Sequence, residues 1–454
     1  MKIAIVGWGL EGQSAFKYFG PEHDYLIVSE QPADNFPQRS DKVKLQFLAD
    51  TQGHGLRGSV KDLSYLDGID ACDKIIYQPT AIFNLQKVFG DNQHFWAKAT
   101  TAYDIFSENC PSKNIIGVTG TKGKGTTSTL IAKMLQSSGK SIHIGGNIGT
   151  PILDLLPYIK SDDWVVWELA NFQLKPASYS PHIAVCLMIT EEHLDWHPSM
   201  QDYLDAKANI FKHQRSEDIA IYFADNKYST QIARASLGHK IPYFKKPGAF
   251  VREDGMIVIG DNETQIIHKG EVKLLGEHNL QNICAAVTTV WQVTQDMNAI
   301  KQVLTDFAGL EHRLEFVREI RGVKFFNDSF AATLSAPVAA MEAIKGTKVM
   351  IVGGFDRGLE LDSLARAFTD YKDDVRKVLI IGAIGQRLAQ ALDEAGFRNY
   401  ELIEDNNLNN IVKQSFEVAQ PGDSVILSPG AASFDMFKDF EERGLEFKEA
   451  VNNL

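Results

Sequence analysis

A segment rich in glycine and lysine, Gly117–Leu135, has the residue types and spacing needed to hold a phosphate. A short apolar run precedes it and an apolar-periodic run follows, which together predict a strand, a tight loop and the start of a helix. Backbone N–H groups exposed by Gly120, Gly123 and Gly125 can point at an anion, and the helix N-terminus adds partial positive charge. Lys124 would reach the terminal phosphates of a nucleotide.

The spacing of this segment differs from that of the common phosphate-binding loop, Gly-x-x-x-x-Gly-Lys-Ser/Thr. Val118 occupies the position of the first glycine, and Gly125 stands where the Ser/Thr should be. Thr126 and Thr127 follow directly, so a hydroxyl that can bind magnesium is present one residue later. A solvated turn is the alternative, but the predicted strand before the loop and the helix after it favour phosphate binding.

A second glycine motif, Gly7–Gly12, follows a predicted buried strand near the start of the chain. The next predicted strand ends in Ser29-Glu30, about 20 residues later, as in a nucleotide-binding βαβ unit. An acidic residue at that place can contact a ribose or a base edge. A glycine-rich turn without a ligand is the alternative. The substrate-binding candidates are Gly9, Leu10, Ser29 and Glu30.

Polar side chains also follow two predicted strands further along the chain. Glu168 ends an apolar strand, and His193 lies in the polar segment at the end of the predicted strand Ile183–Ile189. Ligands bind beyond the carboxyl ends of strands in open α/β sheets, so we expect both side chains beside the phosphate loop. They would suit magnesium, which takes oxygen ligands and keeps several waters. A solvated glutamate is the alternative for Glu168.

Two predicted helices carry further candidates. Lys207 lies on a helix whose apolar positions face a core, and the simpler interpretation is a lysine that extends along the helix to solvent. Asn279 and Asn282 are three residues apart and share one helical face, where their amides could bind an adenine edge or a phosphate. A helix cap formed by Asn279 is the alternative.

Alternating strand-like and helix-like segments predict an α/β protein with parallel sheets covered by helices. We expect three domains: a Rossmann-like domain at 1–110, a central P-loop domain at 111–310 and a second Rossmann-like domain at 311–454. A small antiparallel insert is expected within Phe250–Lys273, where short strands alternate with turn signals.

Composition narrows the class of function. The chain has 454 residues and a net charge of 46 − 58 = −12, which disfavours binding to nucleic acid or acidic membranes. Its four cysteines are scattered without a CxxC pair, as is typical of thiols in a reducing compartment. We find no signal peptide and no apolar run of about 18 residues, so we expect a cytoplasmic protein.

Taken in order, these motifs resemble those of the Mur ligase family, ATP-dependent amide-bond-forming enzymes of peptidoglycan precursor synthesis. The final segment, LSPGAASFDMFKDFEERGLEF, is similar to the glutamate-adding member in particular. The resemblance covers the whole chain, and the segments that carry it are GVTGTKGKGT, GGNIG (Gly145–Gly149), ELANFQL (Glu168–Leu174), ITEEHLDWH (Ile189–His197), YLDAK, GEHNLQN, HRLEF (His312–Phe316) and NDS (Asn327–Ser329).

The resemblance implies a reaction. The N-terminal domain would bind UDP-N-acetylmuramoyl-L-alanine, the central domain ATP and the C-terminal domain glutamate. The γ-phosphate would pass to the alanyl carboxylate, and the glutamate amine would attack the acyl phosphate with release of phosphate. D-Glutamate and a monomer are expected. The alternatives are an L-glutamate-specific relative, a folylpolyglutamate-type ligase and a non-catalytic nucleotide-dependent scaffold.

The resemblance also implies residue roles. Catalysis would use Lys124, His193 and Lys207. Two Mg²⁺ ions, or Mn²⁺, would be held by Thr126, Glu168, His193 and Lys207, with Lys207 as a carbamate. ATP would contact Gly120, Thr121, Lys122, Gly123, Lys124, Gly125, Thr126, Asn279, Arg313 and Asp328. The muramoyl substrate and the amino acid would contact Asn147, Gln173, Arg357, Ser433 and Phe440.

Departures from the family pattern concern three places besides Gly125. Gln78-Pro79-Thr80 stands where the family has Ser-Pro-Gly. Phe330 and Ala332 replace the lysine and threonine of the family's NDSKAT. Arg357 stands where a lysine often binds the side-chain carboxylate, and its planar guanidinium could hold both oxygens of that group.

Overall fold

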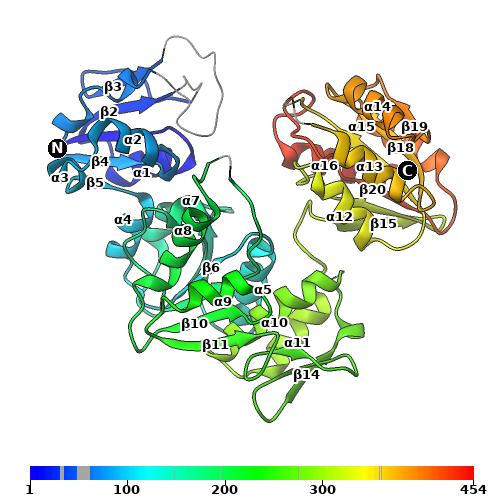
Figure 1. The fold of residues 1–454 in the computed structure, drawn as a ribbon, viewed down its shortest axis with the longest axis horizontal. Helices are drawn as coiled ribbons and strands as arrows, with labels where there is room; N and C mark the ends of the chain where they lie inside the picture. The colour runs from blue at the N-terminus through cyan, green and yellow to red at the C-terminus, as the bar shows by residue number, and fades with distance from the viewer. Residues whose placement is uncertain are drawn as a thin grey trace. The chain divides into compact units, whose positions relative to one another are not determined.

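The computed structural model describes residues 1–30, 35–48, 62–147, 149–194, 196–274, 276–356, 358 and 360–454. The chain forms two compact units (Figure 1). The first contains Met1–Val272 and Asn279–Thr305, and the second contains Lys273–His278 and Asp306–Leu454. Strands and helices alternate throughout, which confirms the predicted α/β class. In the described part of the chain, no helix is long and apolar enough to cross a membrane.

The first unit begins with a parallel sheet in the order β3-β2-β1-β4-β5. The central strand β1 is apolar and almost wholly buried, as expected for a strand covered on both faces. The strands are β1 (Lys2–Val6), β2 (Asp24–Ser29), β3 (Val43–Phe47), β4 (Lys74–Tyr77) and β5 (Ala99–Thr100), and the helices are α1 (Leu10–Phe19), α2 (Ile82–Phe89), α3 (Gln93–Trp96) and α4 (Ala102–Asn109).

The central sheet is also parallel, in the order β11-β10-β9-β6-β8-β7. Its strands are β6 (Ile115–Thr119), β7 (Ile142–Gly146), β8 (Trp164–Glu168), β9 (Ile183–Cys186), β10 (Ile219–Phe223) and β11 (His239–Tyr243). Its helices are α5 (Lys124–Ser137), α6 (Ile152–Leu155), α7 (Asn171–Leu174), α8 (Met200–Lys212), α9 (Lys227–Ala233), α10 (Glu277–Trp291) and α11 (Met297–Asp306).

The predicted antiparallel insert is confirmed. It is formed by β12 (Phe250–Val251), β13 (Met256–Ile259) and β14 (Thr264–His268). The predicted strand Ile183–Ile189 is too long: the observed strand, β9, ends at Cys186, three residues before Ile189. Beyond Cys186 the chain hydrogen-bonds to the phosphate loop, because Thr121 N–H donates to the Met188 carbonyl at 2.9 Å.

The second unit contains a sheet in the order β15-β16-β20-β17-β18-β19, in which only the β15–β16 pairing among the described residues is antiparallel. Met350 and Val352 of β17 lie in one apolar cluster, and Val349 and Ile351 lie in another. This alternation is that of a strand covered by helices on both faces.

The strands of this sheet are β15 (Glu315–Ile320), β16 (Val323–Asn327), β17 (Lys348–Gly353), β18 (Val375–Ile381), β19 (Tyr400–Leu402) and β20 (Ser424–Leu427). Its helices are α12 (Ser335–Ala343), α13 (Asp362–Asp370), α14 (Gly385–Glu394), α15 (Leu408–Val418) and α16 (Phe440–Asn452).

Candidate active site at the carboxyl edge of the central sheet

The predicted strand, loop and helix around Gly120 are confirmed: β6 ends at Thr119, and α5 begins at Lys124. Gly120 has φ +154° and Gly123 has φ +86°, backbone conformations that favour glycine. A Cβ atom on Gly123 would also collide with Asn282 Oδ1. The loop therefore presents its backbone closely to the space at the N-terminus of α5, where an anion is stabilised.

Lys124 lies over its own loop. Its Nζ donates hydrogen bonds to the carbonyl oxygens of Gly120 at 3.1 Å and Thr121 at 3.0 Å. In this position the ammonium group is held beside the helix N-terminus. Thr126 and Thr127 are buried on the first turn of α5, and the Thr127 hydroxyl has no hydrogen-bond partner among the described residues.

Lys207 reaches the same loop from α8. Its Nζ donates to the Gly120 carbonyl at 2.8 Å, and the residue is only 1% exposed, so it does not extend to solvent. Burial, with a further contribution from Lys124, lowers the Lys207 pKa to about 7, although the carboxylates of Glu192 and Glu168 oppose this shift. Near pH 7 a substantial fraction of this amine is therefore neutral.

Glu168 ends β8 and is 3% exposed, so it is not a solvated glutamate. Its Oε1 accepts a hydrogen bond from Asn147 Nδ2 at 2.8 Å, and the Asn147 N–H donates to the Glu168 carbonyl at 3.0 Å. The predicted metal ligand and the predicted substrate-binding amide therefore lie together.

His193 lies in the segment after β9 with φ +56°, which few non-glycine residues adopt. Its carbonyl accepts N–H hydrogen bonds from Trp196 at 3.0 Å and His197 at 2.8 Å. The imidazole packs edge-on against Phe172, and its Nε2 lies 3.7 Å from Glu192 Oε2. A tight turn thus presents the ring of His193, which is about one-third exposed.

Asn279 and Asn282 lie on one face of α10, as the spacing predicts. Asn282 Nδ2 donates to Asn279 Oδ1 at 2.8 Å, and both residues are buried. The helix begins at Glu277, so Asn279 is inside the helix and is not its cap. Asn282 also packs against Gly123, which brings this amide pair to the phosphate loop.

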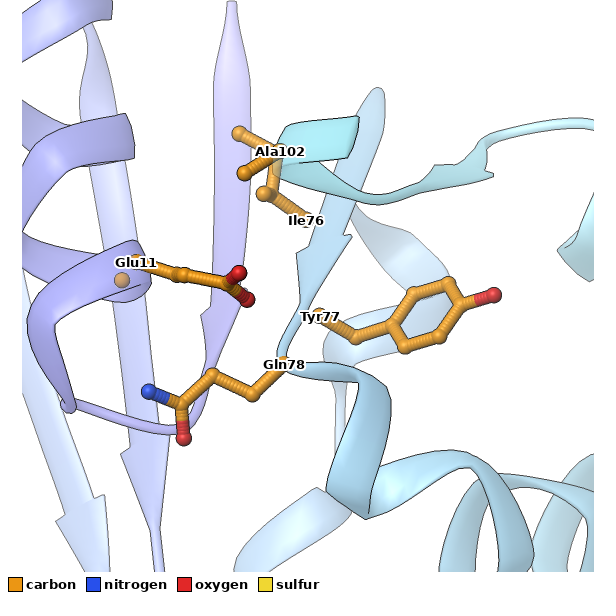
Figure 2. A pocket seen from close by; sticks show the side chains of 6 residues that line it. Glu11, Ile76, Tyr77, Gln78 and Ala102 are labelled. Carbon is orange, nitrogen blue, oxygen red and sulfur yellow. The ribbon is translucent and has the colours of Figure 1, made fainter. Parts of the chain in front are cut away.

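The glycine turn between β1 and α1 is covered by side chains (Figure 2). Gln78, in the Gln-Pro-Thr that replaces Ser-Pro-Gly, packs so closely that a Cβ atom on Gly7 or Gly9 would collide with it. Glu11 Oε1 accepts a hydrogen bond from Gln173 Nε2 at 2.6 Å, and burial raises the Glu11 pKa. The predicted substrate contact Gln173 is thus joined to this turn through Glu11, a residue that the sequence analysis assigned no role.

Two further predicted substrate contacts, Ser29 and Glu30, lie at the carboxyl end of β2. Ser29 ends the strand, and the exposed Glu30 follows it. Glu30 Oε1 accepts hydrogen bonds from Asn84 Nδ2 at 2.9 Å and from the Tyr65 hydroxyl at 3.3 Å. These neighbours hold the carboxylate at the carboxyl end of the strand. On the neighbouring turn, Gly9 is the N-cap of α1 and Leu10 is the first residue of the helix.

In the second unit, Asp328 follows β16 and is buried. Its oxygens accept hydrogen bonds from the Leu314 N–H at 3.1 Å and the Ser428 hydroxyl at 2.7 Å, and burial raises its pKa to about 6. Ser433 is buried, and its carbonyl accepts backbone hydrogen bonds from the residues that follow it. The predicted contact Arg357 lies outside the described residues.

Phe330, which replaces a lysine of the family motif, has a defined set of neighbours. The Arg313 guanidinium carbon lies 4.6 Å from the centre of its ring, a cation–π arrangement. Phe440 also packs edge-on with Phe330, with ring centres 5.0 Å apart. Three of the residues at this edge of the C-terminal sheet thus form one cluster.

The residues at the central loop fit a magnesium ion that also uses nucleotide phosphates and water. Within the described ranges, no group of three or more His, Cys, Asp or Glu side chains is placed to hold a metal alone. Magnesium, however, is commonly held by one or two carboxylates together with phosphates and water. The buried Glu168 carboxylate ends β8, and the buried Thr127 hydroxyl, which has no partner within the described ranges, lies on the first turn of α5. These are oxygens of the kind that magnesium takes.

His197 is the residue of this edge that the sequence analysis missed. It is completely buried, with Nδ1 2.6 Å from Asp202 Oδ2 and Nε2 2.8 Å from Asn171 Nδ2. Burial lowers its pKa, so the ring is neutral near pH 7. Its only signal in the sequence is its place at the end of the segment ITEEHLDWH, because its partners lie on other elements.

A parallel sheet with a phosphate loop, a buried carboxylate and two lysines at its carboxyl edge defines a nucleotide-binding α/β enzyme. Residues 118–290 match the family model of the Mur ligase middle domain, and residues 312–430 match that of the Mur ligase glutamate ligase domain. The chain belongs to the Mur ligase family, whose members are ATP-dependent ligases that form amide bonds.

Relatives match along the full chain. The UDP-N-acetylmuramoylalanine–D-glutamate ligase of Acetivibrio thermocellus is 34% identical, with 100% of this chain and 96% of that protein covered. The protein of the same name from Clostridium acetobutylicum is 35% identical at the same coverage. Among solved structures, the MurF ligase from Thermotoga maritima in complex with ADP has a TM-score of 0.58 and 16% identity, over 99% of this chain and 95% of that one, and supports the fold.

Proposed function

We propose that this chain is an ATP-dependent ligase that joins D-glutamate to UDP-N-acetylmuramoylalanine in peptidoglycan precursor synthesis, releasing ADP and phosphate. The observation that carries the proposal is the meeting of Lys124, Lys207 and Glu168 at one phosphate loop. The names of relatives that match along the full chain support the choice of substrates.

The chemistry required is activation of a carboxylate. A carboxylate is a poor acyl donor, and transfer of the γ-phosphate to its oxygen creates a leaving group that the glutamate amine can displace. Lys124 and the N-terminus of α5 stabilise the negative charge on the phosphates during transfer. The loop backbone holds the phosphates in line, which lowers the entropic cost of the reaction.

Magnesium would offset the remaining charge on the phosphates and the acyl oxygen. We assign one ion to Glu168 and a hydroxyl of the first turn of α5, with Thr126 as the predicted ligand. The Thr127 hydroxyl, which has no hydrogen-bond partner in the part of the chain that the structure describes, is a second candidate for that place. His193 and Lys207 would serve a second ion, and Mn²⁺ could replace Mg²⁺ at both.

The remaining contacts follow the expected three domains, 1–110, 111–310 and 311–454. We assign ATP to Gly120–Thr126 and Asn279, with Arg313 and Asp328 from the C-terminal domain. The chain would work as a cytoplasmic monomer, which size-exclusion chromatography can check. The contacts assigned to the muramoyl substrate and the amino acid are Gly9, Leu10, Ser29, Glu30, Asn147, Gln173, Arg357, Ser433 and Phe440.

We further propose that Lys207 is carbamylated in the active enzyme. A neutral amine reacts with CO₂ to form a carbamate and release a proton, and the lowered pKa of Lys207 supplies the neutral amine. The product carries carboxylate oxygens that can bind a metal ion, where the unmodified side chain has only an amine nitrogen. Lys207→Ala should lose nearly all activity, and formate or acetate at high concentration should restore part of it. Lys212→Ala, on the exposed face of the same helix, is the matched control.

The reaction is tested by omission. ADP and phosphate should be released only when UDP-N-acetylmuramoyl-L-alanine, glutamate, ATP and magnesium are all present. ATP turnover that ignores the muramoyl substrate would contradict the assignment. A folate acceptor that supports turnover would indicate the folylpolyglutamate-type ligase, and no ATP consumption with any acceptor would indicate a scaffold.

The choice of enantiomer has its own test. Inverting the α-carbon while the side-chain carboxylate is held exchanges the positions of amine, carboxylate and hydrogen, so the two enantiomers need different partners. We expect the larger kcat/KM with D-glutamate. A value at least tenfold higher with L-glutamate, about 1.4 kcal/mol in transition-state binding, would overturn the choice.

A further inference from the structure

A network of hydrogen-bonded polar side chains lies at the carboxyl edge of the central sheet, around the buried His197. At its centre, the His197 imidazole is 0% exposed and lies among the rings of Phe172, Trp196 and Tyr203. Its two nitrogens hydrogen-bond to Asp202 and Asn171, as described above. A polar ring enclosed by aromatic side chains is stable only with both nitrogens satisfied.

The hydrogen bonds fix the state of the ring. Asp202 can only accept when ionised, so Nδ1 carries the proton and donates to Oδ2 at 2.6 Å. The Asn171 amide nitrogen can only donate, so Nε2 accepts at 2.8 Å. Lys175 forms an ion pair with the other oxygen of Asp202 and is the last member of the network. Every polar atom of the imidazole is therefore used, and the ring has one possible orientation.

This network of hydrogen bonds joins the elements that carry the proposed metal ligands. Asn171 starts α7, three residues after Glu168. Asp202 lies in the first turn of α8, which also carries Lys207. The backbone N–H of His197 itself donates to the carbonyl of His193.

We propose that His197 is a positioning residue for the metal and phosphate chemistry of this site. It fixes the strained turn of His193 against the helix of Lys207 and the end of β8. The ring makes no contact with substrate in this role. The inference rests on the proposed metal site, because its effect is exerted through the ligands of that site. Residues that orient metal ligands in this way typically change metal affinity by about 10- to 100-fold when replaced.

The test uses the full chain with Mn²⁺ as the probe and ADP present, and follows free Mn²⁺ by electron paramagnetic resonance. His197→Asn can keep the hydrogen bond to Asp202, and His197→Gln can keep the one to Asn171. Each variant should bind Mn²⁺ about tenfold more weakly or worse. If neither variant folds, Asn171→Ala is used instead. This substitution removes the hydrogen bond to His197 Nε2 without changing the imidazole, and it should weaken Mn²⁺ binding to the same extent.

A matched control separates positioning from loss of stability. His182 pairs with Asp218 through Nδ1 at 2.8 Å at the opposite edge of the same sheet. His182→Asn should lower the melting temperature without changing Mn²⁺ affinity. Equal Mn²⁺ affinity in the wild type and the His197 variants would overturn the positioning role alone. No Mn²⁺ binding by the wild type in the presence of ADP would overturn the proposed metal site and the positioning role with it.

Discussion

The two edges of the central sheet use the same residue types for different purposes. At the amino edge, His143 pairs with Asp163 at 2.9 Å and His182 pairs with Asp218 at 2.8 Å. Each pair joins the starts of two neighbouring strands, β7 with β8 and β9 with β10. These pairs are partly exposed to solvent, and each imidazole meets a carboxylate directly.

The carboxyl edge is built at a cost to stability. Lys207 is buried with a carbonyl oxygen as its hydrogen-bond partner and a pKa lowered to about 7. Gly123 and His193 have positive φ angles, which are strained for most residues. Such features persist where they serve binding, so the position of a polar residue along the strand is more informative than its type.

The largest effect is expected at the phosphate loop. Lys124→Met removes the cation that lies over Gly120 and Thr121, and should lower kcat/KM about 1000-fold, or about 4 kcal/mol. Steady-state kinetics with all substrates present measure this loss. Lys133→Met, on the exposed face of the same helix, should retain wild-type kinetics. Equal losses in both variants would show that general destabilisation, and not the site, is responsible.

The sequence predicted the α/β class, the phosphate loop and the antiparallel insert because each depends on local spacing. Glycines at fixed offsets and the alternation of apolar residues are readable without knowing the partners. The length of β9 was wrong because its last predicted residues bond to the loop after β6, a contact set by the tertiary fold.

The candidate site was predicted less completely. Glu168 and Lys207 were named, but their burial beside one loop depends on strand order, which the sequence does not state. His197 lies at the end of a quoted motif, but neither its role nor that of Glu11 could be predicted, because their partners Asp202, Asn171 and Gln173 lie on other elements. Resemblance to a family supplies motif residues, whereas the residues that orient them become visible only with the packed structure.

The second-largest effect extends the comparison to the carboxyl edge of the C-terminal sheet. Burial raises the Asp328 pKa to about 6 from its ordinary value of 3.8, so the folded state binds this proton more tightly than the unfolded state. Stability should therefore fall as pH rises from about 4 to about 6, by on the order of 3 kcal/mol at most. Asp328→Asn should remove this contribution.

Urea unfolding of the C-terminal transition between pH 4 and 7 measures the Asp328 effect. Asp370→Asn, at an exposed position of the same unit, should keep the wild-type change of unfolding free energy with pH. Asp328→Asn should lose the pH dependence of the unfolding free energy. If it keeps the wild-type dependence, burial does not destabilise the charged Asp328 carboxylate, and the C-terminal sheet then does not show the contrast between its carboxyl edge and the amino edge.

A smaller effect on ADP binding is expected at Gly123, where backbone strain can be separated from a steric clash at the phosphate loop. Gly123 and Gly139 have nearly equal positive φ angles, +86° and +83°, but only a Cβ on Gly123 meets a neighbour, Asn282. Both alanine variants should lose about 1–2 kcal/mol of stability. Gly123→Ala alone should also weaken ADP binding about tenfold, measured by isothermal titration calorimetry. Weakened ADP binding by Gly139→Ala, just beyond the C-terminal end of α5, would show that backbone strain alone is enough.

The smallest effect is expected at the amino edge, where a double-mutant cycle on His182 and Asp218 isolates the energy of one pair. Their side chains are 37% and 15% exposed, so solvent screens the interaction and the coupling should be about 0.5–1 kcal/mol. Asp218 also accepts the Arg215 N–H at 2.7 Å, so His182→Phe and Asp218→Asn should differ in cost. Neither variant should change kcat, since the pair lies at the strand ends opposite the phosphate loop. A fall in kcat with unchanged melting temperature would place chemistry at the amino edge, and the division of labour between the two edges would then be wrong.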